Sequence, residues 1–450
     1  MPARALTHAV LKDWKPKGFF AGDRLEGLVK TRNVSPQDRR LATELIFGVI
    51  RRQATLDALL KPHVSRPKEK VEAELWMLLR LGTYQLTFLS GMADHAAVHE
   101  TVELAKSVNA RWAGFVNAVL RKVTGLMTDD VLSVPTADGV PLVDGRYRLL
   151  TRKIFPDPDD DPLGYFTTAF SFPAWLATRW EERFDTDDLF DLGRHFNTPP
   201  TMTLRVNRTK ATRDAVLEEL KAVKIKAKPS GGHPEAIRLK ESTRVEELPG
   251  FAEGRVTVQD ETAMHAATLL DPQPGQRVLD LCAAPGTKTS HLAELMNDTG
   301  TIVAADVSKT RLSRVAENIA RLGLTCVETV KIGEDGSGLP AGEFDAVLLD
   351  VPCSNTGVLG KRPEARWRLT PHDLTELPPK QTQLLSLALD RVKPGGRVVY
   401  STCSIEPEEN EQVVQAALAG RSGVSVVETR LHLPGDPSDG GFQTLLVKAR

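Results

Sequence analysis

Apolar residues recur at helical spacing through the first third of the chain. In the stretch DRRLATELIFGVIRR they fall on one face of a helix: Leu41, Leu45, Ile46, Val49 and Ile50. The same spacing continues in ELWMLLRLGTYQLTFL, in HAAVHETVELAKSV and in FVNAVLRKV. Because strand-like alternation is scarce here, the pattern predicts an all-α bundle over residues 1–125.

The pattern changes at residue 126. The stretch TADGVPLVDGRY is typical of a short hairpin with Asp-Gly turns, and FPDPDDDPLG is acidic and interrupted by prolines. We therefore predict a linker or insert over 126–165 and assign it no fold. A helical pattern in FPAWLATRWEERF, followed by strand and helix patterns in MTLRVNRTK and AVLEELKAV, predicts a small α+β segment over 166–255.

Strand and helix patterns alternate regularly over 256–450. The expected strands are QRVLDLCAA, TIVAADV, FDAVLLDV and GRVVYSTCS, and the expected helices include KTSHLAELM, KTRLSRVAENIARL and PKQTQLLSLALDRV. Strands that are almost continuously apolar and joined by helices belong to a parallel sheet covered on both faces. We predict an α/β domain for this part of a multidomain chain.

Length and composition are those of an ordinary globular protein. The chain has 450 residues, of which 41% are hydrophobic and 26% charged, enough for two or three domains. It contains neither an apolar run of membrane-spanning length nor an N-terminal secretory pattern. Four cysteines without a C-x-x-C pair indicate free thiols, and we expect a reduced, cytoplasmic protein without a metal site.

Charge is distributed unevenly along the chain. The net charge is −1, but residues 1–125 contain 20 lysines and arginines against 12 aspartates and glutamates. A basic N-terminal part on a neutral whole suggests a domain that binds a polyanion. A merely solvated, lysine-rich surface is an equally good interpretation of charge alone.

The candidate chemistry lies where the predicted strands end, because ligands of open α/β sheets bind outside the carboxyl ends of the strands. One strand runs into CAAPGTKT, where Gly286 allows a close approach of the backbone to a ligand. The next strand ends in Asp306, a position suited to the ribose hydroxyls of a nucleotide-like cofactor. The turn lacks G-x-G-x-x-G, which argues against a dinucleotide and favours a phosphate-free nucleoside such as S-adenosylmethionine. An unspecified nucleotide-binding domain is the alternative.

Two cysteines follow two strands of the predicted sheet. In AVLLDVPCSNTG, Cys353 comes just after the strand that ends at Asp350, and in YSTCS, Cys403 follows another strand. Two thiols at one edge of the sheet could act on one substrate atom. Free cysteines are often only small buried hydrophobes. That interpretation suits Cys326 and Cys282 better than Cys353, which opens an irregular loop.

Three motifs, in this order, resemble the cytosine-C5 RNA methyltransferases of the Nol1/Nop2/Sun family: VLDLCAAPGTKT, DVPCSNTGV and YSTCSIEPEENE. The stretches LRVN, VQDE, RPEARWR and GGFQTLLVK extend the resemblance, and 126–165 is foreign to it. The N-terminal part is similar to the NusB-like RNA-binding domain that, within this family, is appended to the bacterial 16S ribosomal RNA enzyme. The resemblance implies a NusB-like bundle, a small α+β RNA-recognition segment and a Rossmann-like S-adenosylmethionine-dependent domain.

The resemblance also implies a mechanism. Cytosine C5 becomes nucleophilic when a thiolate adds to C6; C5 then takes the sulfonium methyl group, and loss of a proton and elimination free the enzyme. By resemblance Cys403 is the nucleophile, Cys353 assists release, and Asp350 binds the N3/N4 edge of the extruded base. A free thiol is mostly protonated at neutral pH, so Cys403 needs a lowered pKa, for which Lys288 is a candidate neighbour.

For the cofactor, the resemblance implies contacts from Asp306 at the ribose, from Asp335 near the adenine and from Asp350 near the methionine end. The cofactor loop would contribute Cys282, Ala283, Ala284, Pro285, Gly286, Thr287 and Lys288. Asp335 is alternatively a plain turn residue. Thr287 departs from the family's usual second glycine, which puts the loop's approach to the cofactor in doubt, and Gln443 replaces a usual aromatic that we expect to matter only for packing.

Basic and aromatic side chains suited to phosphate contact and base stacking are candidate RNA contacts: Arg205, Asn207, Arg362, Arg366, Trp367 and Arg368. The alternative is that Trp367 belongs to a core and the arginines are solvated. The expected substrate is a stem-loop of 16S ribosomal RNA with an extruded cytosine. We expect a monomer that binds neither membrane nor metal.

Other functions stay open. The catalytic part would equally suit an enzyme that acts on transfer RNA or large-subunit ribosomal RNA. A non-catalytic RNA-binding assembly factor is disfavoured because both Cys353 and Cys403 are present together with Asp350. DNA cytosine methylation is disfavoured too, because those enzymes use a Pro-Cys thiol as nucleophile but lack the cysteine of STCS.

Overall fold

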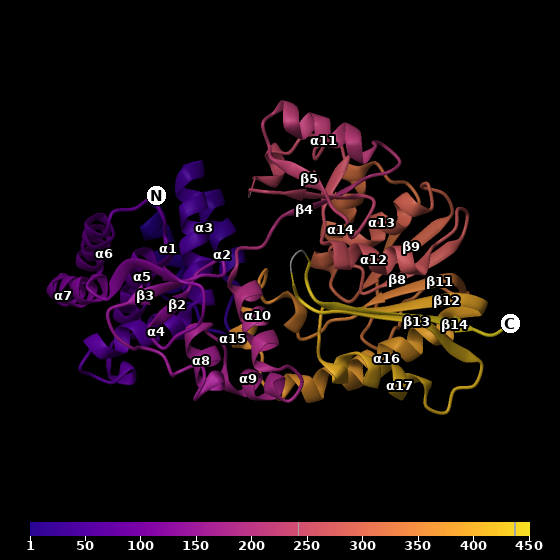
Figure 1. The fold of residues 1–450 in the computed structure, drawn as a ribbon. Coiled ribbons are helices and arrows are strands. Elements are labelled where there is room, and N and C mark those ends of the chain that lie inside the picture. Colours follow the sequence, from indigo (N-terminus) through magenta and orange to yellow (C-terminus); the bar gives the residue numbers. More distant parts are fainter. Residues whose placement is uncertain (242, 436–437) are drawn as a thin grey trace. The chain divides into compact units, whose positions relative to one another are not determined.

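The computed structural model describes residues 1–241, 243–435 and 438–450. It divides into two compact units (Figure 1). Unit 1 consists of Met1–Pro199 together with Leu359–Pro371, and unit 2 consists of Pro200–Val358 together with His372–Arg450. A short segment that follows the Cys353 loop in sequence therefore belongs to the compact unit of the N-terminal half.

The first 125 residues of unit 1 form the predicted all-α bundle. Its helices are α1 (Ala3–Leu11), α2 (Ala21–Thr31), α3 (Pro36–Arg51), α4 (Gln53–Leu60), α5 (Ala73–Phe88), α6 (Asp94–Val108) and α7 (Trp112–Thr124), with short 3-10 turns η1 (Lys61–His63) and η2 (Lys68–Lys70). Helix α3 starts where its sequence predicts, because Ser35 Oγ accepts a hydrogen bond from the Asp38 amide (3.1 Å) and proline occupies the first turn. Apolar faces of the helices meet in one core that includes Leu45, Leu78 and Leu120.

Residues 126–165 are folded, so the prediction of a linker was wrong for most of this stretch. It contains a three-stranded antiparallel sheet in the order β1 (Met127–Leu132), β3 (Tyr147–Leu150), β2 (Gly139–Pro141). The predicted hairpin is the β2–β3 pair. The sheet is joined to helix α8 (Pro162–Ala169) by Tyr165, which is fully buried and whose hydroxyl donates a hydrogen bond to the Gly139 carbonyl (3.2 Å). Sequence periodicity missed this packing because the strands are short.

Unit 1 continues from α8 through α9 (Ala174–Glu181) and α10 (Thr186–Asn197), and ends with α15 (Ala365–Arg368) of the returning segment. Arg366 of α15 has no exposed surface and donates hydrogen bonds to the carbonyls of Arg51 (3.1 Å) and Ser171 (2.9 Å) and to Asn197 Oδ1 (3.1 Å). Its guanidinium lies 3.9 Å from the ring centre of Phe172. Because burial removes solvation and these acceptors are neutral, the pKa of Arg366 is well below its usual value.

Unit 2 begins with a four-stranded antiparallel sheet in the order β5 (Ala227–Pro229), β6 (Ala236–Leu239), β4 (Thr203–Val206), β7 (Val256–Val258), packed against α11 (Arg213–Ala222). Strand β7 pairs with β4, with Arg205 opposite Thr257. The predicted boundary at residue 256 therefore falls inside this sheet. The predicted α+β segment also starts too early, at residue 166, because α8 to α10 pack in unit 1 and unit 2 begins only at Pro200.

The rest of unit 2 is a seven-stranded sheet in the order β10-β9-β8-β11-β12-β14-β13. The strands are β8 (Arg277–Leu281), β9 (Thr301–Asp306), β10 (Val327–Lys331), β11 (Phe344–Asp350), β12 (Val392–Thr402), β13 (Val424–His432) and β14 (Gly441–Lys448). Strands β10, β9, β8, β11 and β12 are parallel, while β14 runs antiparallel to both of its neighbours. The order reverses between β8 and β11, where a doubly wound sheet opens a ligand-binding crevice.

Helices cover both faces of this sheet, as the continuous apolar strands predicted (Figure 1). Val278 and Ala346 point to one face, which α12 (Glu261–Leu270), α13 (Thr287–Leu295) and α14 (Lys309–Leu322) cover. Leu279 and Val347 point to the other face, toward α16 (Asp373–Arg391) and α17 (Glu411–Leu418). Helix α16 starts earlier than expected, with two prolines in its first half. Among the described residues, no helix is long and apolar enough to span a membrane.

Four histidines of unit 2 lie in a row that ends at His432, the last residue of β13. The ring centre of His233 is 5.5 Å from that of His265 and 5.6 Å from that of His291, and His265 stacks on His432 at 5.4 Å. Burial lowers the pKa of all four; it reaches about 4 for His265 and about 3 for His291. Within the described parts of the chain, no group of histidine, cysteine or acidic side chains is arranged to hold a metal ion.

The row predicts a loss of stability in acid. Between the ordinary histidine pKa of 6.5 and the lowered value of about 4 for His265, the unfolded chain binds protons that the folded chain does not. The free energy of unfolding therefore falls as pH falls through this window. We expect urea midpoints measured from neutral pH to about pH 5 to fall less steeply for His265→Gln than for the wild type. The exposed His372→Gln is the control, and identical slopes for His265→Gln and wild type would contradict this account.

Candidate active site

The predicted site residues come from strand ends on both sides of the switch point. Asp280 lies next to the last residue of β8, Asp306 ends β9 and Asp350 ends β11. Cys403 follows β12 directly, and the register of the sheet sets Asp350 opposite Ser401 of that strand. The structure thus brings together side chains that are far apart in sequence, as expected for the carboxyl edge of a parallel sheet.

Two thiols meet at this edge. The Sγ atoms of Cys353 and Cys403 lie 3.1 Å apart, and both cysteines are free and partly exposed. Cys403 Sγ also lies 3.4 Å from Asn355 Oδ1. The hydrogen bond with Cys403, reinforced by burial, raises the pKa of Cys353 well above its ordinary value. The raised pKa favours a protonated Cys353 thiol, and either sulfur can be the donor in this contact.

A lysine from the cofactor loop reaches the same place. Lys288, in the first turn of α13, makes an ion pair with Asp350, with Nζ 2.7 Å from Oδ2. Burial disfavours the ammonium group, but Asp350 outweighs this and raises the pKa of Lys288, with a smaller contribution from Cys403. Lys288 is thus a cation that interacts with Cys403, and a neighbouring cation favours a thiolate.

A buried carboxylate, Glu409, holds the two cysteine loops together. It lies in η5 (Pro407–Glu409) and has no exposed surface. Its Oε1 accepts hydrogen bonds from the Ser354 amide (2.8 Å) and Gln381 Nε2 (3.0 Å), and its Oε2 accepts from Ser404 Oγ (2.5 Å) and from Ser354 Oγ. Ser354 and Ser404 are the residues immediately after the two cysteines. Glu409 therefore fixes one loop relative to the other.

Sequence reasoning missed Glu409. The only signal was its position in the motif YSTCSIEPEENE, where four glutamates are equivalent by pattern. Burial raises the pKa of Glu409, while hydrogen bonds from Ser354 and Ser404 oppose that shift. A carboxylate that meets this many donors offsets its cost of burial through hydrogen bonds that favour the ionised form.

Backbone contacts also join these loops. The Gly357 amide donates a hydrogen bond to the Cys403 carbonyl (3.0 Å), and the Ile405 amide donates to Thr356 Oγ1 (3.1 Å). A Cβ atom at Gly357 would lie 2.6 Å from the Gly440 backbone, so only glycine fits this crossing. The geometry of the thiol pair is thus determined by buried contacts rather than by the cysteines themselves.

The cofactor loop makes a tight turn between β8 and α13. Cys282 and Gly286 have positive φ values of 69° and 99°, and the Ala283 amide donates to the Ala305 carbonyl of β9 (3.0 Å). A Cβ at Gly286 would approach Val315 of α14 to within 3.1–3.2 Å. The close packing of this turn against α14 therefore requires glycine at position 286. Burial raises the pKa of the Cys282 thiol to about 12, which keeps it protonated and unsuited to nucleophilic attack.

Three carboxylates lie at this edge, and two of them have cationic partners: Lys288 pairs with Asp350, and Arg311 lies 3.5 Å from Asp306. Asp306 is almost fully buried and accepts a hydrogen bond from the Ser308 amide (2.9 Å). Asp280 is fully buried; Thr289 Oγ1 donates to its Oδ2 (2.5 Å), while its Oδ1 has no hydrogen-bond partner in the described parts of the chain. Burial raises the pKa of Asp280 to about 7.

The remaining predicted cofactor residues lie apart from this group of contacts. Asp335 is exposed and accepts a hydrogen bond from the Ser337 amide (3.0 Å), which is the contact of an ordinary turn residue. Its predicted role at an adenine ring stays a prediction. The Thr287 carbonyl accepts a hydrogen bond from Arg205 of β4 (2.8 Å), which fixes the backbone of the loop at this residue.

Three of the predicted RNA contacts are wrong, because the side chains are buried and used inside the protein. Arg205 pairs with Glu294, both with no exposed side-chain surface, with Nη2 2.7 Å from Oε1. Asn207 is 1% exposed and donates to the Gly254 carbonyl (3.1 Å). Arg366 is the buried anchor of α15.

The remaining predicted RNA contacts lie in and beside α15, and they have different outcomes. Trp367 Nε1 donates to the Ile50 carbonyl (2.7 Å) and the ring packs on the core of unit 1, which agrees with the alternative that Trp367 is a core residue. Arg368 donates to the Gly18 carbonyl (2.9 Å). Arg362 is exposed and stays a predicted RNA contact. Gln443 is buried and donates to the Thr262 carbonyl (3.1 Å), so it does more than fill space.

The fold and this site define an α/β methyltransferase that carries a helical N-terminal domain. Residues 267–444 match the family model of the 16S rRNA methyltransferase RsmB/F, residues 1–125 match the NusB family, and residues 172–246 match the ferredoxin-like domain of RsmF/B-like methyltransferases. The chain belongs to the 16S rRNA methyltransferase RsmB/F family.

Relatives over nearly the full length support this assignment. The chain is 36% identical to the probable ribosomal RNA small subunit methyltransferase B of Synechocystis sp., over 92% of this chain and 89% of the relative. It is 37% identical to ribosomal RNA small subunit methyltransferase B of Salmonella typhi, over 93% and 92%. Among solved structures, that of PH0851 covers 100% of this chain and 99% of its own, with a TM-score of 0.77 and 26% identity. A methyltransferase homolog from Pyrococcus horikoshii covers 63% of this chain and 97% of its own, with a TM-score of 0.56 and 28% identity.

The Glu409 contacts predict a large effect of one substitution. Glu409→Ala leaves the Ser354 amide and the Gln381 amide group without their buried acceptor, and we expect the free energy of unfolding to fall by about 3 kcal/mol in urea titrations. Glu411→Ala, a partly exposed glutamate two residues away, is the matched control and should change it by less than about 0.5 kcal/mol. Equal losses for the two variants would show that Glu409 does not hold the loops.

Proposed function

We propose that this chain transfers a methyl group to C5 of a cytosine in small-subunit ribosomal RNA. One observation carries the proposal: the Sγ atoms of Cys353 and Cys403 lie 3.1 Å apart, beside the Lys288–Asp350 ion pair. Membership of the family supports the class of reaction, and the relatives named ribosomal RNA small subunit methyltransferase B support the class of substrate.

S-adenosylmethionine, which supplies a methyl group on a positively charged sulfonium, is the proposed methyl donor. The methyltransferase family to which the chain belongs supports this choice. We propose that the loop 282–288 and Asp306 hold the nucleoside part, with Asp306 at the ribose hydroxyls. Asp335 is proposed for the adenine, and Asp350 for the side where the methionine and the cytosine meet.

Cys403 is proposed to act as nucleophile. Its thiolate forms a bond to C6 of the extruded base, the C5–C6 double-bond electrons move onto C5 and the ring, and C5 accepts the methyl group. The C5 proton then leaves to solvent, the double bond re-forms, and the C6–sulfur bond breaks to return the thiolate. Asp350 is proposed to accept a hydrogen bond from the exocyclic amine of cytosine, and Lys288, its ion-pair partner, to favour the thiolate electrostatically.

Cys353 is proposed to assist release. Its raised pKa keeps the proton on its sulfur, 3.1 Å from the Cys403 sulfur. A hydrogen bond from Cys353 to the departing sulfur stabilises the thiolate that forms as the C6–sulfur bond breaks. Without that donor, the covalent protein–RNA adduct should accumulate.

Denaturing gels test these roles directly. Wild type, Cys353→Ala and Cys403→Ala are incubated with 16S ribosomal RNA and labelled S-adenosylmethionine. Cys326→Ala is the control, because Cys326 directly precedes β10 and so lies at the amino ends of the parallel strands, opposite to the edge that carries the site. We expect an adduct that persists with Cys353→Ala, neither adduct nor product with Cys403→Ala, and normal methylation with Cys326→Ala.

Other outcomes would change the account. An adduct that appears with Cys403→Ala and not with Cys353→Ala would exchange the two roles. Full methylation by both variants would exclude the covalent mechanism. Parallel reactions with large-subunit ribosomal RNA and transfer RNA test the alternative substrates, and binding of 16S ribosomal RNA without any methyl transfer by wild type would favour an assembly factor.

A further inference from the structure

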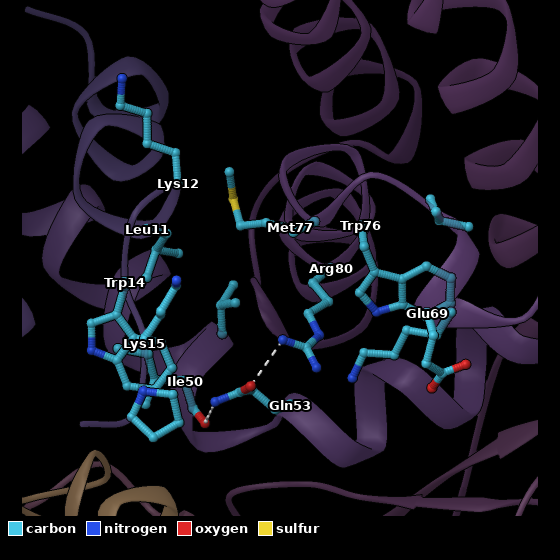
Figure 2. A pocket seen from close by; sticks show the side chains of 15 residues that line it. Leu11, Lys12, Trp14, Lys15, Ile50, Gln53, Glu69, Trp76, Met77 and Arg80 are labelled. Carbon is cyan, nitrogen blue, oxygen red and sulfur yellow. Dashed lines mark hydrogen bonds between the residues drawn. The ribbon is translucent and has the colours of Figure 1, made fainter. Parts of the chain in front are cut away.

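Unit 1 contains a pocket that no step of the methyl transfer uses (Figure 2). It has a volume of about 380 Å³ and lies where the end of α1, the end of α3, η2 and the start of α5 meet. Every residue that lines it belongs to the basic first 80 residues of the chain. The pocket is therefore part of the helical domain, not of the methyltransferase sheet.

The walls are aromatic and apolar, and they are held rigidly. Trp14, which is partly exposed, lies on one side of the pocket and Trp76 on the other, with Met77 between them (Figure 2). Trp76 and Met77 are only 5% and 8% exposed, so Trp14 offers the larger open surface. Each indole N–H has an acceptor: Trp76 donates to Asp57 (2.7 Å) and Trp14 donates to Glu364 of the returning segment (2.9 Å). Because these bonds fix the rings, the pocket is preformed and a flat ligand can enter it without ordering its walls.

The rim is positively charged. Lys12 and Lys15 are exposed and make no ion pair within the described residues, whereas Glu69 is the one acidic side chain among the described residues that line the pocket. Lys68 and Arg80 also line it, but both pair with Asp57 (2.7 Å each). Asp57 offsets only one of these two cations and Glu69 offsets one further positive charge, so the pocket keeps a net positive charge, which suits an anion next to a flat apolar group.

We propose that this pocket binds one unstacked base of single-stranded RNA, with the adjoining phosphates on Lys12 and Lys15. Aromatic side chains combined with lysines form the common platform for unpaired nucleotides, because every base has an apolar face and every link a negative charge. The choice of RNA rests on the proposed function, and the pocket would add a second contact, remote in sequence from the cysteines, that anchors the substrate.

Fluorescence anisotropy with a labelled single-stranded RNA decamer of mixed sequence tests the proposal on the full chain. Lys12→Glu/Lys15→Glu should weaken binding at least tenfold. The slope of log K against log salt concentration should become shallower by about 1.4, since each single-strand phosphate contact contributes about 0.7. Ala73→Leu, which adds carbon atoms at the lining position of exposed Ala73, should weaken binding at least threefold and leave the slope unchanged. Lys30→Glu/Lys122→Glu changes the charge equally at lysines outside the pocket lining and should have little effect.

Two results would overturn the proposal. If both double variants weaken binding equally, the domain attracts RNA through general charge and not through this pocket. If Lys12→Glu/Lys15→Glu weakens binding but Ala73→Leu does not, no base enters the pocket. In methylation assays we expect the pocket variants to raise KM for 16S ribosomal RNA and to leave kcat unchanged. A wild type that binds the decamer through the pocket but methylates nothing would refute the proposed function alone.

Discussion

The geometry of the candidate active site depends on one buried carboxylate. Glu409 accepts hydrogen bonds from the residues that directly follow Cys353 and Cys403, and so it joins loops that leave two different strands. Both cysteines are free and partly exposed. A short distance between two exposed thiols can persist only if the backbone on both sides is held, and Glu409 with Gln381 provides that hold from within the core.

The chain that follows the Cys353 loop is anchored by a different kind of contact. It continues into residues 359–371, which belong to the compact unit of the N-terminal half, and Arg366 anchors that segment by hydrogen bonds to neutral acceptors. The same segment supplies Glu364, which orients Trp14 in the pocket of the helical domain. The chain between Cys353 and Glu364 therefore links the proposed chemistry to the proposed RNA contact through one short stretch of sequence.

Sequence patterns predicted the helices and strands from the spacing of apolar residues, and they predicted the site from the residues that follow the strands. The apolar run before Asp350 and the residues after it placed Cys353 at the edge of the sheet, and the parallel topology then brought Cys403 beside it. Charge patterns were less informative, because a buried arginine and an exposed one look the same in sequence. Arg205 was expected on the surface, yet it pairs with Glu294 in a core, since the partner lies on a helix that sequence spacing does not connect to it. Glu409 was missed for the same reason.

The central claim is that Cys403, not Cys353, bonds to the base. RNA that contains 5-fluorocytidine tests it most directly, because fluorine at C5 cannot leave as a proton and the covalent adduct is trapped. Trypsin places the two cysteines in separate peptides, 332–361 and 398–421, so mass spectrometry can assign the bond. The account predicts that peptide 398–421 carries the nucleotide. A nucleotide on peptide 332–361, or methylation without any bonded peptide, would contradict it.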